Sequence, residues 1–159
     1  MWSFSPISGE GAAKVGGRFN RPGEPTLYLA LDIMTAVNEC TQGLTQRLQP
    51  LTMCEYDVDC YPVADLRTEA DRLALGVALA DIGCGWLTFL RASKDAPSWL
   101  VVDRLKAGGY AGLLAPSFAH GAGPTNNNLI LWRWGPDLPT RVSVFDPDGR
   151  LPKDQSSWR

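Results

Sequence analysis

The stretch from Gly16 to Glu39 constrains this chain more than any other part of it. It opens with a glycine-bracketed loop, Gly16-Gly17-Arg18-Phe19-Asn20-Arg21-Pro22-Gly23, and continues into the apolar run Leu27-Tyr28-Leu29-Ala30-Leu31. Glycine allows backbone conformations that other residues resist, so the loop can admit a ligand close to its backbone. The stretch brings a cation, an aromatic ring and a carboxylate together in sequence. This combination suits a site that grips an anionic, ring-bearing ligand and acts on a sugar.

The residues after this loop predict a strand and then a helix. The run from Leu27 to Leu31 is short and apolar, which is typical of a strand. Asp32 stands where a helix N-cap belongs, and apolar residues then recur at helical spacing, which predicts a helix over 33–43. Glu39 falls at the edge of the apolar face of that helix, which favours a partly buried carboxylate.

The rest of the chain mixes strands and helices without regular alternation. Helices are expected at 69–82 and 97–107, the former with a buried stripe of Leu73, Leu79, Val77 and Ala80. Strands are expected at 51–58, 63–66, 110–115, 129–132 and 141–145, and 86–91 could be strand or loop. Residues 1–24 are expected to form an irregular arm and the polar tail from 153 to fray. This order favours an α+β fold with largely antiparallel sheets and about three helices.

Size and charge exclude several classes of function. The 159 residues are expected to form a single domain over 1–159. The formal charge of −2 and the pI near 5.3 argue against binding to nucleic acid or to an anionic membrane. No apolar run is long enough to span a bilayer, and the first six residues lack the features of a secretory signal. We therefore expect a cytoplasmic protein.

The cysteines and tryptophans point to structural uses. Cys40, Cys54, Cys60 and Cys84 form no C-x-x-C pair, and the single histidine, His120, is remote in sequence, so no metal site is expected. We expect the four cysteines to be reduced and mostly buried. The six tryptophans are expected to anchor the core or an interface.

Five residues could form a site, and each has a plain structural alternative. Arg18 has a planar fork suited to phosphate but could be an ordinary loop arginine. Tyr28 could be a core residue or could stack on a ligand ring. Asn128 could be a turn residue or could contact a ligand. Glu39 could be solvated, or could stabilise a developing oxocarbenium ion at a ribose. Ser117 fits a hydrogen-bond donor at a pocket rim better than a nucleophile, because its surroundings lack the G-x-S-x-G pattern. His120 as a general base is the weaker alternative to a loop histidine.

The order and spacing of these residues are more specific than any one of them. Together they resemble the RES domain, a family named for an arginine, a glutamate and a serine in its pattern. The resemblance spans about residues 4–134 and is most specific in its N-terminal third. It rests on Gly16-Gly17-Arg18-Phe19-Asn20, Gly23, Leu27-Tyr28-Leu29, Thr35-Ala36, Glu39, Gly112-Leu113-Leu114-Ala115-Pro116-Ser117 and Asn128-Leu129-Ile130-Leu131.

The resemblance implies a fold similar to that of ADP-ribosyltransferases and a toxin of a bacterial toxin–antitoxin pair that consumes NAD. Some members cleave NAD by hydrolysis or phosphorolysis, and at least one transfers ADP-ribose to phosphoribosyl-pyrophosphate synthetase. This chain looks close to the transferring type. The resemblance also implies a cognate antitoxin and a protein acceptor as partners, with no metal. The tryptophans and the polar tail are candidates for the antitoxin interface.

The family pattern also assigns a role to each of the five residues. Arg18 would hold a phosphate of NAD, and Tyr28 would stack on the nicotinamide. Glu39 would face the nicotinamide ribose, with Ser117 hydrogen-bonded in the pocket and Asn128 supporting it. Many relatives have another arginine before a Trp-x-Phe-x-Pro segment, a position that would fall at about Met1 here. Either the natural chain starts earlier or this phosphate contact is missing.

Two interpretations from other classes remain open at the level of sequence. The chain could be a nucleotide-binding module without catalysis, or an interaction protein whose apolar surface serves a partner. The enzyme interpretation requires Glu39 to lie in the same cleft as Arg18 and Tyr28, whereas the binding interpretation does not.

Overall fold

The structure, a computed structural model, describes residues 5–41, 52–152 and 154. Within these residues two sheets are accompanied by six helices. The helices are α1 (Glu10–Val15), α2 (Ile33–Thr41), α3 (Glu69–Ala74), α4 (Leu79–Ile82), α5 (Trp86–Arg91) and α6 (Pro97–Ala107). The strands are β1 (Leu27–Ala30), β2 (Glu55–Cys60), β3 (Val63–Asp65), β4 (Gly112–Pro116), β5 (Asn127–Leu131) and β6 (Thr140–Phe145).

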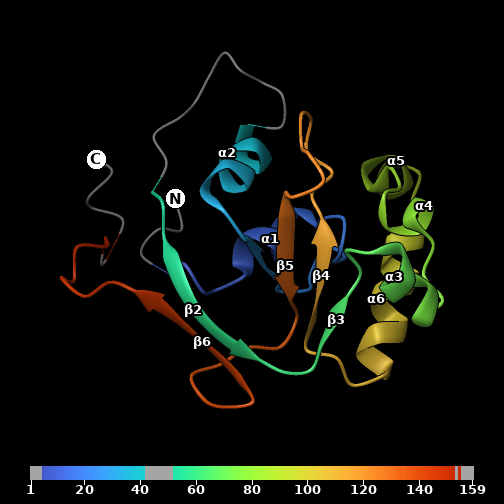
Figure 1. The fold of residues 1–159 in the computed structure, drawn as a ribbon. Coiled ribbons are helices and arrows are strands. Elements are labelled where there is room, and N and C mark those ends of the chain that lie inside the picture. The colour runs from blue at the N-terminus through green and yellow to red at the C-terminus, as the bar shows by residue number, and fades with distance from the viewer. Residues whose placement is uncertain (1–4, 42–51, 153, 155–159) are drawn as a thin grey trace.

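The larger sheet has four strands in the order β1-β5-β4-β3, and β2 pairs with β6 in a separate two-stranded sheet. The pairs β1–β5, β4–β5 and β2–β6 are antiparallel, whereas β3 runs parallel to β4. Figure 1 shows β2 and β6 crossing one side of the molecule while α3 to α6 gather on the other. The predicted α+β class with mainly antiparallel sheets is confirmed.

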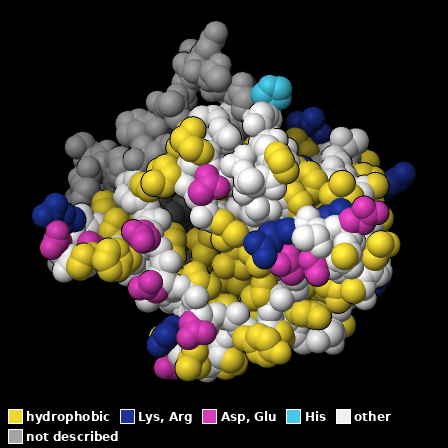
Figure 2. All heavy atoms as spheres, viewed as in Figure 1, with side chains coloured by type: hydrophobic (Ala, Val, Ile, Leu, Met, Phe, Trp, Pro, Cys, Tyr) yellow, Lys and Arg dark blue, Asp and Glu magenta, His cyan; other side chains and the backbone are white. Residues whose placement is uncertain are grey.

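Each face of the four-stranded sheet packs against a different cluster. Residues opposite one another in an antiparallel pair share a face, so Ile130 of β5 lies on the same face as Tyr28 and Leu113. On this face Ile130 and Leu113 pack in a core with Ile82 of α4 and Val102 of α6. The alternate residues pack toward β2 and β6 in a second core, formed by Leu27, Leu129, Leu131 and Val142. In Figure 2, hydrophobic side chains gather in the middle of the visible face, with charged ones around them.

The N-terminal arm is more regular than the sequence suggested, because it contains α1. Three tryptophans from the distant half of the chain donate their indole N–H groups to carbonyl oxygens of this arm. Trp99 donates to Gly17 at 2.9 Å, Trp132 to Phe19 at 2.9 Å and Trp134 to Ile7 at 2.8 Å. Trp99 is buried and the other two are half-buried, and their indole groups tie the arm to α6 and to the segment after β5.

Two expectations for the middle of the chain are wrong. The helix expected over 69–82 is two short helices, because Gly76 takes a φ of 62° and interrupts it. In the expected buried stripe only Val77 is buried, and Leu73 is 71% exposed. Residues 86–91 form α5 rather than strand or loop, since a short apolar run does not distinguish a helix from a strand.

The outer two predicted helices are confirmed within the described residues. α6 begins at Pro97, whose fixed φ suits the first turn, and α2 begins after Asp32 as expected. The far end of the helix expected over 33–43 and the start of the strand expected at 51 lie outside the described residues. None of the described helices has the length and hydropathy needed to cross a membrane.

Candidate active site

Glu39 meets Ser117 and Asn128 at one end of the four-stranded sheet. The hydroxyl of Ser117 donates to Glu39 Oε1 at 2.7 Å, and Asn128 Nδ2 donates to the same oxygen at 2.5 Å. Ser117 directly follows β4, and Asn128 of β5 lies opposite Ala115, two residues earlier in β4. The alternation of strand side chains therefore places both donors on one face, where the half-buried Glu39 reaches them from α2. Among the described residues no hydrogen bond to Glu39 Oε2 is found.

The helix that presents Glu39 is held at its first turn. Asp32 Oδ1 accepts the backbone N–H of Thr35 at 2.8 Å, as an N-cap does. Thr35 also donates its hydroxyl to Asp32 Oδ2 at 2.5 Å. These hydrogen bonds favour the charged carboxylate and lower the pKa of Asp32 below its ordinary value.

Tyr28 presents its ring while its hydroxyl is held by the arginine loop. The hydroxyl donates to Asn20 Oδ1 at 2.8 Å and accepts the backbone N–H of Phe19 at 3.0 Å. The residue is nevertheless 40% exposed, so it is not a core tyrosine. Desolvation of the hydroxyl raises the pKa of Tyr28 above its ordinary range, so the hydroxyl stays protonated near neutral pH.

Arg18 sits at the tip of a tight turn in which Gly17 and Asn20 pair their backbones. Its Nη1 donates to the carbonyl oxygens of Ile82, at 3.2 Å, and Cys84. Its guanidinium lies 4.6 Å from the centre of the Phe118 ring, in a cation–π contact. These contacts fix Nη1 of the guanidinium and thereby orient its other N–H donors.

The electrostatics link Arg18 to the other site residues. Burial lowers the pKa of Arg18, and the nearby Cys84, Glu39 and Tyr28 act in the opposite direction. Glu39 also acts to raise the pKa of Tyr28, whereas Arg18 acts to lower it. The charges of Arg18 and Glu39 therefore act on each other and on Tyr28.

Sequence reasoning missed several residues that build this site. Asn20 is 1% exposed, and its Nδ2 donates to the carbonyl oxygens of Ala12, Arg21 and Glu24. Ser98 of α6 donates to the Arg18 carbonyl oxygen at 2.5 Å. Phe118 could have been suspected because it follows Ser117 directly, but the roles of Asn20 and Ser98 depend on contacts that no spacing reveals.

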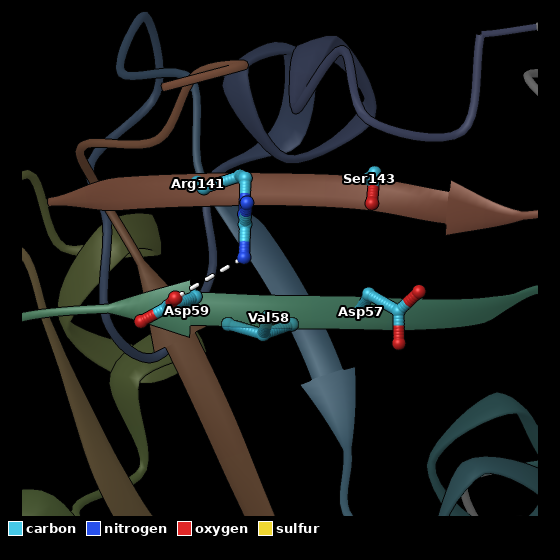
Figure 3. A pocket seen from close by; sticks show the side chains of 5 residues that line it. All are labelled: Asp57, Val58, Asp59, Arg141 and Ser143. Carbon is cyan, nitrogen blue, oxygen red and sulfur yellow. Dashed lines mark hydrogen bonds and ion pairs between the residues drawn. The ribbon is translucent and has the colours of Figure 1, made fainter. Parts of the chain in front are cut away.

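Other features stand apart from this cluster. A hollow of about 530 Å³ on the two-stranded sheet is lined by Asp57, Val58, Asp59, Arg141 and Ser143, as Figure 3 shows. The ion pair between Arg141 and Asp59, 3.2 Å long, crosses this hollow between paired strands. It shares no residue with the Glu39 site.

The remaining candidates lie outside the cluster as well. His120 is exposed on the loop after β4. The four cysteines are free, and Cys40 is exposed while the others are half-buried, so the expectation of mostly buried thiols is wrong. The described residues hold no group of three or more histidine, cysteine, aspartate or glutamate side chains placed to bind a metal.

The family model described as the RES domain matches residues 1–154. The chain belongs to the RES domain family. The resemblance assigned the arginine, glutamate and serine of the family pattern to Arg18, Glu39 and Ser117, and the structure joins Glu39 and Ser117 by a hydrogen bond.

One solved structure supports the same fold. A chain from the crystal structure of the M. tuberculosis MbcT–MbcA toxin–antitoxin complex matches this RES domain with a TM-score of 0.57 and 23% sequence identity. The match covers 88% of this chain and 74% of the other. No curated protein sequence matched this RES domain.

Proposed function

We propose that this RES domain is the NAD-consuming toxin of a bacterial toxin–antitoxin pair and acts in the cytoplasm. In this proposal it cleaves the bond between nicotinamide and ribose and transfers ADP-ribose to a protein. The observation that supports it most is Glu39, whose Oε1 accepts hydrogen bonds from Ser117 and Asn128 and whose charge acts on both Arg18 and Tyr28. Family membership and the fold shared with a chain of a toxin–antitoxin complex support the same proposal.

The chemistry follows from what Glu39 can do. As the bond between the ribose carbon and the nicotinamide nitrogen breaks, its electron pair leaves with nicotinamide, and positive charge develops on the ribose. A carboxylate that is already oriented stabilises this charge without reorganising during the reaction. Ser117 and Asn128 provide that orientation, because both donate to one oxygen of the carboxylate. An acceptor nucleophile then forms the new bond to the ribose carbon and loses its proton.

The other two residues suit the binding of the substrate. Arg18, fixed along one edge by backbone carbonyls, would use its free donors for a phosphate of NAD. Tyr28 keeps an exposed ring for stacking on nicotinamide, since its hydroxyl is bonded to the loop below. In this proposal the substrate would lie between α2, β1 and the arginine loop.

The group that attacks the ribose carbon decides between two candidate activities. We propose a protein acceptor, with phosphoribosyl-pyrophosphate synthetase as the candidate that the resemblance to RES toxins implies. Water or phosphate as the attacking group would make the same site an NAD hydrolase or phosphorylase. A nucleotide-binding module without catalysis is the candidate from another class. A cognate antitoxin would be the regulatory partner.

The test uses NAD labelled on its adenylate half, incubated with the purified chain and a bacterial extract. We expect labelled protein and an equal amount of free nicotinamide, because each transfer releases one nicotinamide. Glu39→Ala should abolish both signals. The control is Glu69→Ala, which removes an exposed carboxylate at the start of α3 and should leave both signals unchanged.

The possible outcomes separate the candidates. Nicotinamide without labelled protein would replace the transferase by a hydrolase or phosphorylase. Full activity in Glu39→Ala would remove Glu39 from the reaction. If the folded wild-type chain produces neither labelled protein nor nicotinamide, the binding module is favoured. The binding module is also favoured if bacteria that express the chain continue to grow.

A further inference from the structure

We propose that Asn126 is a positioning residue that fixes Glu39 for the reaction, an inference that rests on the proposed function. Asn126 lies between Ser117 and α2, on the loop that leads into β5, and is half-buried. It belongs to none of the motifs from which the site was predicted. It acts through other residues, because Glu39 takes its hydrogen bonds from Ser117 and Asn128.

Asn126 joins three parts of the site with one side chain and its own backbone. Its Nδ2 donates to Thr35 Oγ1 on α2 at 2.7 Å, and its Oδ1 accepts the backbone N–H of Gly123 at 2.8 Å. Its carbonyl oxygen accepts the backbone N–H of Ser117 at 2.8 Å. The same residue therefore holds the helix of Glu39, the loop after β4 and the serine that bonds Glu39.

Thr35 transmits this contact to Glu39. The two residues are four apart on α2, so they lie on the same face of the helix, about one turn from each other. Thr35 is completely buried, and its hydroxyl donates to Asp32 while accepting from Asn126. The Asn126 amide thus fixes how far α2 is rotated toward the sheet, which determines where the Glu39 carboxylate lies.

The expected consequence is on the chemical step more than on substrate binding. Neither Arg18 nor Tyr28 has a hydrogen bond to Asn126 in the described part of the chain. A carboxylate displaced by about 1 Å from a developing charge can cost about 100-fold in rate. Loss of the Asn126 amide should therefore lower kcat while KM for NAD stays near the wild-type value.

The first experiment compares Asn126→Ala with Asn127→Ala in nicotinamide release. Asn127 is the adjacent residue of the same type, and its side chain donates to the carbonyl oxygen of Thr125 at 2.8 Å instead of to α2. We expect Asn126→Ala to lose about 10- to 100-fold in kcat, as expected of a misplaced catalytic group, and Asn127→Ala to match the wild type. Equal kcat in the two variants would overturn the inference.

A second pair of variants tests the same connection from the helix, should Asn126→Ala fail to fold. Thr35→Val keeps the volume but removes the hydroxyl that bonds Asn126, whereas Thr35→Ser keeps the hydroxyl. We expect Thr35→Val to reproduce the loss in kcat and Thr35→Ser to retain most of the wild-type rate. The inference is wrong if the two variants lose kcat equally.

A third arm separates positioning from general damage to the fold. In a Glu39→Gln background the catalytic carboxylate is already gone, so Asn126→Ala should change the residual rate little. A loss as large as that in the wild-type background would mean that Asn126 acts independently of Glu39, and it would reject the inference.

An activity-independent readout keeps the inference distinct from the proposed function. The side-chain NH₂ resonances of Asn128 report its hydrogen bond to Glu39. Asn126→Ala should shift them, as Glu39→Gln does, and Asn127→Ala should leave them in place. Unshifted resonances in Asn126→Ala would overturn the inference. Absence of nicotinamide release by the wild type would instead overturn the proposed function, and the resonances would still decide the role of Asn126.

Discussion

Gly17 shows how tightly single residues are constrained beneath the site. A Cβ atom at this position would lie 2.6 Å from the Tyr28 hydroxyl oxygen and 2.7 Å from Asn20 Oδ1. Displacing either atom costs free energy, because the Tyr28 hydroxyl donates a hydrogen bond to Asn20 Oδ1. The Asn20 amide nitrogen is also fixed by hydrogen bonds to three carbonyl oxygens. The glycine is therefore needed for close approach of the tyrosine.

We accordingly predict that Gly17→Ala destabilises the fold by about 1–3 kcal/mol, as overpacking of a filled site does. It should also raise KM for NAD, because the displaced tyrosine ring and arginine loop are the proposed binding surfaces. Denaturant unfolding and nicotinamide-release kinetics measure the two effects. Gly135→Ala is the control, since a Cβ atom there meets nothing within 4 Å. Wild-type stability in Gly17→Ala would show that the tyrosine yields without cost.

At the scale of elements, α2 depends on a charged cap. The first-turn hydrogen bonds from Thr35 lower the pKa of Asp32, and the Asn126 amide donates to the same Thr35 hydroxyl. A carboxyl whose pKa is lower in the folded than in the unfolded chain stabilises the fold above its unfolded pKa, near 4. That contribution is lost as the pH falls through the folded pKa.

We predict that the wild type is more stable than Asp32→Asn at neutral pH and that the difference shrinks as the pH falls below about 4. Thermal unfolding across a pH series measures this convergence. Asp65→Asn is the comparison, because Arg67 likewise lowers the pKa of Asp65, at the end of β3 and away from Glu39. Both variants should approach the wild type in acid, but only Asp32→Asn should also lower kcat at neutral pH. A stability difference that does not change with pH would contradict the role of the cap.

Elements were predicted from sequence where a local signal defines them. The caps at Asp32 and Pro97 predicted the starts of α2 and α6, because capping and φ restriction act within one turn. The break at Gly76 was missed because it depends on a positive φ, and the helix over 86–91 was missed because a short apolar run does not distinguish a helix from a strand. In the site, five residues were given roles from motif spacing. Asn20 lies in the loop motif but received no role, and Asn126 lies in no motif, because their side-chain hydrogen bonds form only in the fold.

At the scale of the whole molecule, the four-stranded sheet separates two cores with different tasks. The core that contains Ile130 shares its face with Tyr28 and Asn128, whereas the core that contains Leu131 faces β2 and β6. Both residues are completely buried, and they are adjacent in β5. They form a matched pair that differs in the face of the sheet.

We predict that Ile130→Ala and Leu131→Ala each cost about 2–5 kcal/mol in stability, as truncation of a buried aliphatic side chain does. Their kinetics should differ, because Ile130 lies opposite Tyr28 in the sheet whereas Leu131 lies opposite Leu27. Under conditions where both variants are folded, Ile130→Ala should change kcat or KM, and Leu131→Ala should not. Chemical unfolding and steady-state kinetics measure both. Equal kinetic losses would show that the two cores are not separable.

The indole and hydroxyl groups that donate hydrogen bonds to the arginine loop determine when the site becomes complete during synthesis of the chain. The carbonyl oxygens of Gly17, Arg18 and Phe19 are bonded by Trp99, Ser98 and Trp132, and Glu39 is bonded by Ser117 and Asn128. A ribosome synthesises the arginine and the glutamate before all of these partners. A nascent chain that has not yet released residue 132 lacks part of both halves of the site. The chemistry proposed here would therefore begin only after synthesis has passed that residue.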